Sequence, residues 1–265
     1  LACRFREVPR GLSKLIEDLT AVDPRSRPSA ADAAERMRSV RAGATPNVWP
    51  EPTYVDSGDW WAPLEGCLGA KGHPRVWILE GQTGSGRRRT AGQLHRQGLM
   101  QGVWPIHLTC KANVVGGPIE ELLEVLLLEG RDEEWSSSVF GSDASLLRRM
   151  WPGLPWPPAE EGPIPTLQEV AEAAARCVAQ AARTRRLLVI VHRSEHVDRL
   201  TARTLTRVAG SRDLAVGVLL LHDPRWKTER SGRLMTRLQQ RQGAGRLTMP
   251  PLPPADAMAV ARSIA

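Results

Sequence analysis

The chain has 265 residues, of which 42% are hydrophobic and 25% charged, proportions that exclude a disordered or fibrous protein. Its net charge of +7 comes mostly from arginines that are scattered along the chain without a long block of like charge. We interpret them as compositional bias, so nucleic-acid binding is not expected. No apolar run approaches the ~20 residues that cross a bilayer, and a cytoplasmic location is expected.

The four cysteines include no closely spaced pair of the kind that binds metal. Cys110 and Cys177 fall in apolar runs typical of a strand and a helix, so we expect both to be small core residues. A reducing compartment agrees with this pattern. The chain begins without methionine and within an expected element, so we expect it to be part of a longer protein.

Residues 1–41 predict two helices separated by a proline-containing turn. Ser29 is expected to cap the second helix, with Asp32 as its partner acid. Residues 42–57 are rich in proline and predict a linker. The first helix is indicated by apolar residues at helical spacing: Leu12, Leu15, Ile16 and Leu19.

From residue 58 to about 250 the pattern alternates between strands and helices, which implies a parallel sheet with helices on both faces. An irregular insertion is expected over 130–163, with one short helix at 144–150. A truncated helical lid is expected over 251–265. Strands are predicted over 75–79, 103–108, 187–191, 215–221 and 246–249. Helices are predicted over 61–68, 87–99, 119–128, 167–182, 199–208 and 231–240.

A glycine-rich loop follows the first predicted strand and precedes a predicted helix, which is the context of a phosphate-binding P-loop. In such a loop the backbone N–H groups and the helix N-terminus hold phosphate. A lysine and a serine or threonine normally follow, but this chain has Arg87 and Arg88, and Arg88 has no oxygen for Mg²⁺. An ordinary glycine turn is the alternative. The G-x-x-x-x-G frame consists of Gly81, Gln82, Thr83, Gly84, Ser85 and Gly86.

The strand predicted over 187–191 is the place where a P-loop ATPase carries acidic residues for Mg²⁺ and water. Here His192 and Arg193 take those positions. His192 has no partner at metal-ligand spacing, so no metal site is expected. Glu195 and Asp198 are acidic residues further along that could act as substitutes.

These segments together resemble the AAA-type ATPase domains of the STAND class of bacterial signalling regulators, from about Tyr54 to the end of the chain. Asp198 matches the last Asp of the family's acidic motif, and 247–257 resembles the entry to its helical lid. The resemblance implies an α/β, P-loop NTPase-like domain over 58–250 with a degenerate ATP site. We expect weak ATP binding or none, no support for Mg²⁺, and no catalytic residue.

Residues 12–33 resemble the last two helices of a protein Ser/Thr kinase domain, since Asp23 to Ser29 follow the pattern D-P-x-x-R-P-S/T. The resemblance gives Asp23 and Arg27 structural roles. The kinase catalytic residues are absent from this chain. An attached upstream kinase domain, a downstream helical or repeat sensor region and protein partners are therefore implied. A generic helix–turn–helix is the alternative.

Three functions remain open at this point. The first is a regulatory module, fused to a kinase, that binds ATP weakly or not at all and does not hydrolyse it. The second is an active, divergent ATPase that uses Arg87 with Glu195 or Asp198. The third is a basic module that binds nucleic acid or docks proteins.

Overall fold

The computed structural model describes residues 10–21, 27–29, 32–33, 36, 61–69, 75–129, 133–156, 162–211, 214–251, 254 and 258. Asp23, the expected linker and nearly all of the expected lid lie outside these residues. The chain divides into two compact units, Leu1–Val55 with Pro254–Ala265 and Asp56–Pro253. Each unit is described by itself.

The first unit contains the predicted helix α1, Arg10–Leu19. The cap predicted for the second helix is confirmed, because the hydroxyl of Ser29 accepts a hydrogen bond from the backbone nitrogen of Asp32 at 3.2 Å. The same hydroxyl donates to the Asp32 carboxylate at 2.7 Å. Arg36 forms an ion pair with Asp18 of α1 at 2.8 Å. The Ser29 contacts are local to the start of the second helix, and the ion pair joins Arg36 to α1.

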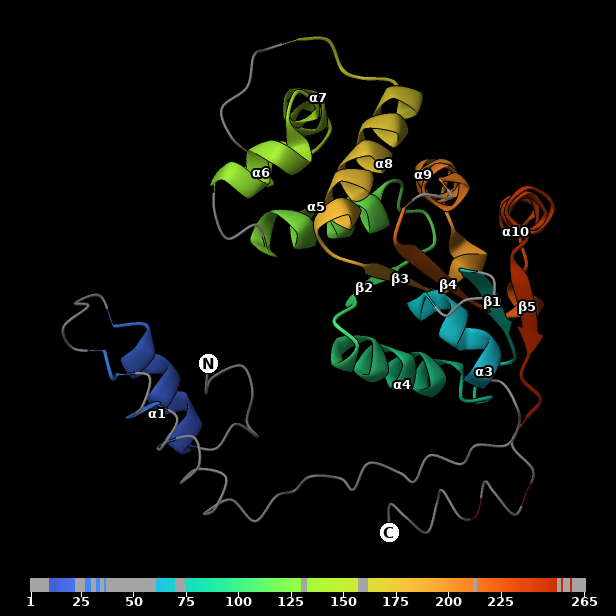
Figure 1. Ribbon diagram of the computed structural model, residues 1–265, viewed down its shortest axis with the longest axis horizontal. Helices are drawn as coiled ribbons and strands as arrows, with labels where there is room; N and C mark the ends of the chain where they lie inside the picture. Colours follow the sequence, from blue (N-terminus) through green and yellow to red (C-terminus); the bar gives the residue numbers. More distant parts are fainter. Residues whose placement is uncertain are drawn as a thin grey trace. The chain divides into compact units, whose positions relative to one another are not determined.

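The second unit is built on a five-stranded sheet in the order β2-β3-β4-β1-β5, and every neighbouring pair of strands is parallel (Figure 1). The three inner strands are almost entirely buried, as expected for a sheet covered on both faces. This confirms the predicted α/β class and all five predicted strands. The strands are β1 (Val76–Glu80), β2 (Trp104–Thr109), β3 (Leu187–His192), β4 (Val216–His222) and β5 (Gly245–Thr248).

Helices cover both faces of the sheet, as predicted (Figure 1). On one face lie α3 (Trp61–Leu64), the 3-10 turn η2 (Glu65–Leu68) and α4 (Arg87–Met100). On the other face lie α5 (Gly117–Glu129), α8 (Leu167–Thr184), α9 (Arg199–Gly210) and α10 (Glu229–Gln242). Two short turns, η3 (Ser194–His196) and η4 (Pro224–Trp226), follow β3 and β4. In the described part of the chain no helix is long and apolar enough to span a membrane.

The short helix expected over 144–150 is confirmed as α7 (Asp143–Met150). The expectation that the insertion is otherwise irregular was wrong, because a second helix, α6 (Glu133–Phe140), forms before it. The ring of Phe140 packs edge-on against Trp156, with 5.2 Å between ring centroids. The indole nitrogen of Trp156 donates to the backbone oxygen of Trp151 at 2.8 Å. The insertion therefore adds to the core over α8 instead of forming a surface loop.

Close packing between η2 and the sheet depends on a glycine in the central strand β4. A Cβ atom at Gly217 would overlap the backbone carbonyl of Cys67. The thiol of Cys67 also contacts the backbone oxygen of Val218 at 3.7 Å. The expected core positions of Cys110 and Cys177 are confirmed, since both are buried.

Candidate functional site

The loop between β1 and α4 has the backbone form that its glycines predict. Gly84 and Gly86 have φ angles of 91° and 88°, in the left-handed region that glycine adopts without strain. Gly86 is the residue before the first turn of α4. The loop therefore directs the N-terminus of α4 toward the carboxyl edge of the sheet, where parallel strands end and anions commonly bind.

Asp223, directly after β4, occupies part of this loop with its carboxylate. Its Oδ2 atom accepts hydrogen bonds from the backbone nitrogen of Thr83 at 3.0 Å and from the Thr83 hydroxyl at 3.1 Å. The Arg87 guanidinium lies 3.3 Å from the same oxygen. An ionised side chain of the protein thus takes one of the backbone donors that a bound phosphate would use.

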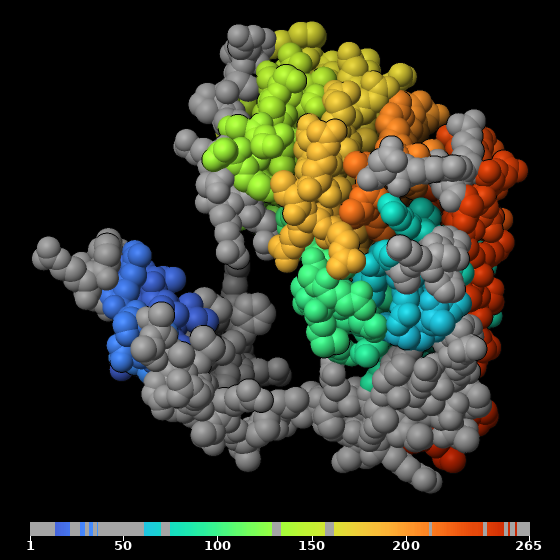
Figure 2. Space-filling model, viewed as in Figure 1, coloured from blue at the N-terminus to red at the C-terminus, as the bar shows by residue number. Residues whose placement is uncertain are grey.

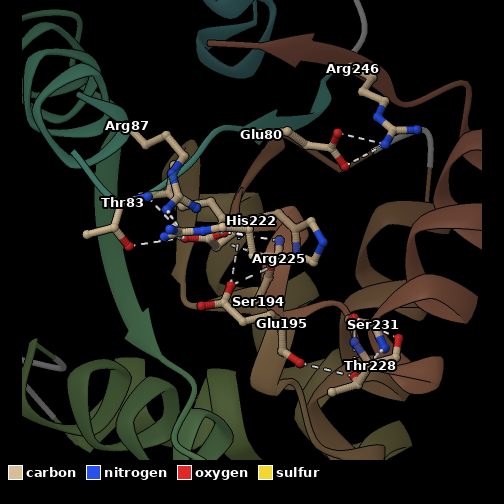
Figure 3. A network of polar contacts seen from close by, with 12 residues as sticks. Glu80, Thr83, Arg87, Ser194, Glu195, His222, Arg225, Thr228, Ser231 and Arg246 are labelled. Carbon is tan, nitrogen blue, oxygen red and sulfur yellow. Dashed lines mark hydrogen bonds and ion pairs between the residues drawn. The ribbon is translucent and has the colours of Figure 1, made fainter. Parts of the chain in front are cut away.

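Arg225 fixes the position of this carboxylate. Its side chain donates two hydrogen bonds, from Nε to Oδ1 of Asp223 at 3.1 Å and from the terminal nitrogen to Oδ2 at 2.9 Å. This pairing, with the Thr83 contacts, holds the pKa of Asp223 well below its usual range although burial opposes the charge. Asp223 is only 2% exposed, so its carboxylate is a buried group whose charge is favoured by its arginine and threonine partners. Figure 3 shows Thr83, Arg87 and Arg225 converging on this point.

Arg87 occupies the lysine position of the P-loop pattern but is already engaged. Its side chain is only 14% exposed and forms an ion pair with Asp223 at 3.3 Å. Burial lowers the pKa of Arg87, and the Asp223 carboxylate partly offsets that effect. Arg88 is exposed, and the hydroxyl of Thr90 faces the core, 3.8 Å from the sulfur of Met249. No hydroxyl is therefore available at the start of α4 to bind a metal ion.

Of the two acidic substitutes considered from the sequence, the structure brings one to the loop. Glu195, in η3, is 5% exposed, and its carboxylate accepts a hydrogen bond from the backbone nitrogen of Asp223 at 3.2 Å. Asp198 instead caps α9, accepting from the backbone nitrogens of Leu200 at 2.8 Å and Thr201 at 3.0 Å. The Asp198 carboxylate is therefore engaged in a helix cap, and its use at an ATP site stays a prediction.

A buried histidine, which was not among the site residues predicted from the sequence, lies next to these acids. His222, the last residue of β4, is fully buried, with its Nδ1 atom 3.9 Å from the Glu195 carboxylate. The hydroxyl of Ser194 lies 3.4 Å from the same nitrogen. Burial lowers the pKa of His222, although Glu80 and Glu195 favour its charged form. Its backbone oxygen also accepts a hydrogen bond from the nitrogen of Gly81 at 3.2 Å, so His222 joins the end of β4 to the start of the loop.

His192, for which the sequence offered no partner at metal-ligand spacing, is hydrogen-bonded to another histidine. Its Nε2 atom lies 2.8 Å from Nδ1 of His107 on β2, and Nε2 of His107 lies 2.8 Å from Nδ1 of His95 on α4. Burial, with the neighbouring His107 and Arg88, lowers the pKa of His192 to about 4. His107 uses its two ring nitrogens in different directions, so the three rings form a hydrogen-bonded row and not a shared metal site. Among the described residues no group of His, Cys, Asp or Glu could hold a metal ion.

A cavity of about 750 Å³ opens at this edge of the sheet, a size typical of small-molecule sites. It brings together most of the site residues predicted from the sequence. The loop contributes Gln82, Thr83, Gly84, Gly86, Arg87 and Arg88. The segment after β3 contributes His192, Arg193 and Glu195, and Gly81, Ser85 and Asp198 do not line the cavity.

The cavity has an excess of positive charge but does not fit Mg²⁺. Mg²⁺ prefers oxygen ligands in octahedral geometry. The two carboxylates at the cavity, Asp223 and Glu195, are already bonded to Arg225 and to the Asp223 backbone. Arg88 and Arg193 supply cations where oxygen ligands are needed.

In the first unit, the predicted structural residue Arg27 donates from Nε to the backbone oxygen of Ala21 at 3.0 Å. This contact joins the turn to the end of α1.

No protein-family model matches the chain, and no curated protein matches it.

Proposed function

We propose that residues 58–250 form a degenerate P-loop domain of a signalling protein in which a Ser/Thr kinase domain precedes it. In this proposal the domain binds ATP weakly or not at all and does not hydrolyse it. Its role is regulatory. The observation that carries the proposal is the carboxylate of Asp223 on the backbone nitrogen of Thr83.

Weak binding follows from competition between two anions. An incoming phosphate must displace a carboxylate that is held by Arg225, Thr83 and Arg87, with the closest contact at 2.9 Å. Hydrogen bonds to charged groups contribute about 1.5–3 kcal/mol each, so a ligand must replace several of them at once. The binding free energy that a phosphate would gain from the backbone donors of the loop is therefore largely offset by the cost of displacing the Asp223 carboxylate.

The lack of hydrolysis follows from the side chains at the cavity, which do not supply the oxygen ligands and the acid that the reaction needs. Arg88 stands at the hydroxyl position, and His192 and Arg193 stand at the acidic positions after β3. In-line attack on a phosphate needs oxygen ligands for Mg²⁺ and an acid that orients water. The cavity offers one carboxylate in a suitable place, Glu195, and it already accepts from the Asp223 backbone.

A regulatory role fits the way in which the site joins several elements. Asp223 connects the loop after β1 with the turn η4 after β4, through Thr83 and Arg225. Thr228, at the end of that turn, donates to the backbone oxygen of Glu195 at 3.1 Å and caps α10. Displacement of Asp223 by a ligand would release Arg225 and bias the position of η4 and α10. Such a shift is the kind of two-state change that couples a ligand to an attached domain.

An active, divergent ATPase is the second candidate, and the position of Glu195 favours it. This carboxylate is buried and lines the same cavity as Arg87. In this alternative Glu195 would orient the attacking water.

Calorimetric titration with ATP, with and without Mg²⁺, separates the two candidates. The proposal predicts a dissociation constant above ~100 μM that Mg²⁺ does not improve, and no phosphate release. Binding below that value that requires Mg²⁺, together with turnover that Glu195→Gln abolishes, would support the active ATPase instead.

A further inference from the structure

A second cavity, of about 720 Å³, lies between α9 and α10. We call it the arginine groove. Two acidic side chains, Glu195 and Glu229, also line it. Its defining residues are Arg199 and Arg203 of α9 and Arg230, Arg233 and Arg237 of α10.

Helical geometry places these arginines on two facing surfaces. Arg199 and Arg203 are four residues apart on α9, and the three arginines of α10 are separated by three and four residues. Residues at these spacings lie on one side of a helix. The two helices pack side by side over the same sheet face, so their arginine rows border one hollow. In Figure 2 these helices form the orange and red surface.

Several arginines elsewhere in the second unit form ion pairs with carboxylates. Arg176 pairs with Asp143, Arg207 with Glu172 and Arg246 with Glu80, each at 2.6 Å. In the groove, Arg233 pairs with Glu229. The other four arginines make no ion pair with any residue that the structure describes. Like charges in one hollow repel each other and attract an anionic ligand.

Two of these arginines lie in the first turn of a helix, where a positive charge lowers the stability of the helix. Arg199 is the first residue of α9, and Arg230 is the second residue of α10. A positive charge in the first turn of a helix opposes the helix dipole. Neither residue gains a partner within the described chain in return. Their placement is explained if the charge serves a bound anion.

The floor of the groove indicates what kind of anion fits. Val197 and Leu234 line it and are 1% and 2% exposed, and Ala202 lies beside them. No phenylalanine, tyrosine or tryptophan is among the described residues that line it, so it lacks the rings on which nucleic-acid bases stack. The accessible lining is therefore mainly basic, and without aromatic rings it fits an acidic polypeptide better than a nucleic acid.

We propose that the arginine groove binds an acidic segment of a polypeptide chain. Glutamate or aspartate side chains of the segment pair with Arg199, Arg203, Arg230 and Arg237, and an apolar side chain packs beside Ala202. The groove shares Glu195 with the cavity of the P-loop, so a docked segment lies next to that site. The proposal stands without nucleotide binding, because it rests on α9 and α10 alone.

Fluorescence anisotropy on the full chain tests this proposal. The probe is a labelled synthetic peptide with glutamate on one helical face and leucine on the other. Arg199→Gln with Arg230→Gln is expected to weaken binding about tenfold, since each exposed pair contributes up to about 1 kcal/mol. Both substitutions remove an unfavourable charge from a helix N-terminus, so the fold is expected to persist. Arg203→Gln with Arg237→Gln is expected to weaken binding similarly.

Matched controls make the test specific. Arg96→Gln with Arg183→Gln removes the same charge from α4 and α8, away from the groove, and is expected to change binding less than twofold. A peptide with glutamine in place of glutamate is expected not to bind. Equal loss in the groove and control variants would overturn the proposal, since it would show bulk charge attraction. Tighter binding of a single-stranded oligonucleotide that the groove variants abolish would also overturn it.

Discussion

The carboxylate of Asp223 accepts a hydrogen bond from the backbone nitrogen of Thr83 at 3.0 Å. The two residues lie at the carboxyl ends of β4 and β1, which are adjacent in the sheet. An acidic side chain of the protein is thus hydrogen-bonded to a backbone nitrogen of the loop that the sequence pattern predicts to bind phosphate. The glycines therefore preserve the backbone shape of the loop, but one of its backbone donors is already bonded to Asp223.

Restoring the P-loop residues is expected to raise ATP affinity. Arg87→Lys with Arg88→Thr supplies a compact charge and a hydroxyl, and it removes the Arg87 contact with Asp223 at 3.3 Å. We expect about tenfold tighter binding of ATP in the presence of Mg²⁺, measured by calorimetry. Arg96→Lys, further along α4, is the control and is expected to have no effect. If the double variant binds no better than wild type, the cavity does not admit the phosphates.

Acidification is expected to destabilise the second unit through the histidine row. The pKa of His192 is about 4 in the folded chain, below the ordinary value near 6.5 of the unfolded chain. Between these values the unfolded state binds more protons, so stability falls as pH falls from about 6.5 to 4. Urea unfolding across this range measures the effect.

His192→Gln is the matched variant for that pH series. It removes the titrating ring and one of the two 2.8 Å contacts of His107. We expect a shallower dependence of the urea midpoint on pH than in wild type. Parallel curves for the two proteins would contradict a role for His192 in the acid sensitivity.

Asp198 is expected to matter for stability and not for ligand binding. It accepts from two backbone nitrogens at the start of α9. Asp198→Ala is expected to lower the free energy of unfolding by about 1–2 kcal/mol, and Asp198→Asn by less, since asparagine also caps helices. Nucleotide titrations should be unchanged in the folded variants. A selective loss of ATP binding or turnover in Asp198→Asn would return this residue to the site.

Gly217 tests the close packing of η2 on β4. Alanine there would force a Cβ atom against the carbonyl of Cys67, and we expect Gly217→Ala to cost about 3 kcal/mol of unfolding free energy. Gly92, in α4, has no atom within 4 Å of the same added Cβ. Gly92→Ala is therefore expected to stabilise the chain by up to about 1 kcal/mol. Equal effects of the two substitutions in denaturant unfolding would contradict the packing.

The sheet could be predicted because its strands are apolar runs bounded by polar or glycine residues. β3, for example, is Leu187–His192, and the buried residues are those of the predicted run over 187–191. Within the insertion, α7 was predicted but α6 was missed, because 130–163 is rich in proline and tryptophan and shows weak periodicity. Its order depends on packing, such as that of Phe140 on Trp156, which local sequence does not reveal.

The candidate site could be predicted only where one segment defines it. The loop from Gly81 to Gly86 is local, so its glycines were informative. The contact of Asp223 with Thr83 joins residues that are 140 positions apart in the sequence. The contact between His107 and His192 joins residues that are 85 positions apart. A charged residue directly after β4 was the one available signal for Asp223, since the ends of parallel strands meet at one edge.

Calorimetric titration of ATP into wild type and Asp223→Asn tests the central claim most directly. The variant removes the competing charge but keeps a side-chain oxygen for the Thr83 nitrogen. Asp143→Asn, which breaks the ion pair with Arg176 elsewhere, is the matched control. We predict that Asp223→Asn binds ATP at least about tenfold more tightly than wild type, independently of Mg²⁺, while the control does not. Unchanged or weaker binding in Asp223→Asn, or tight Mg²⁺-dependent binding by the wild type, would contradict the account.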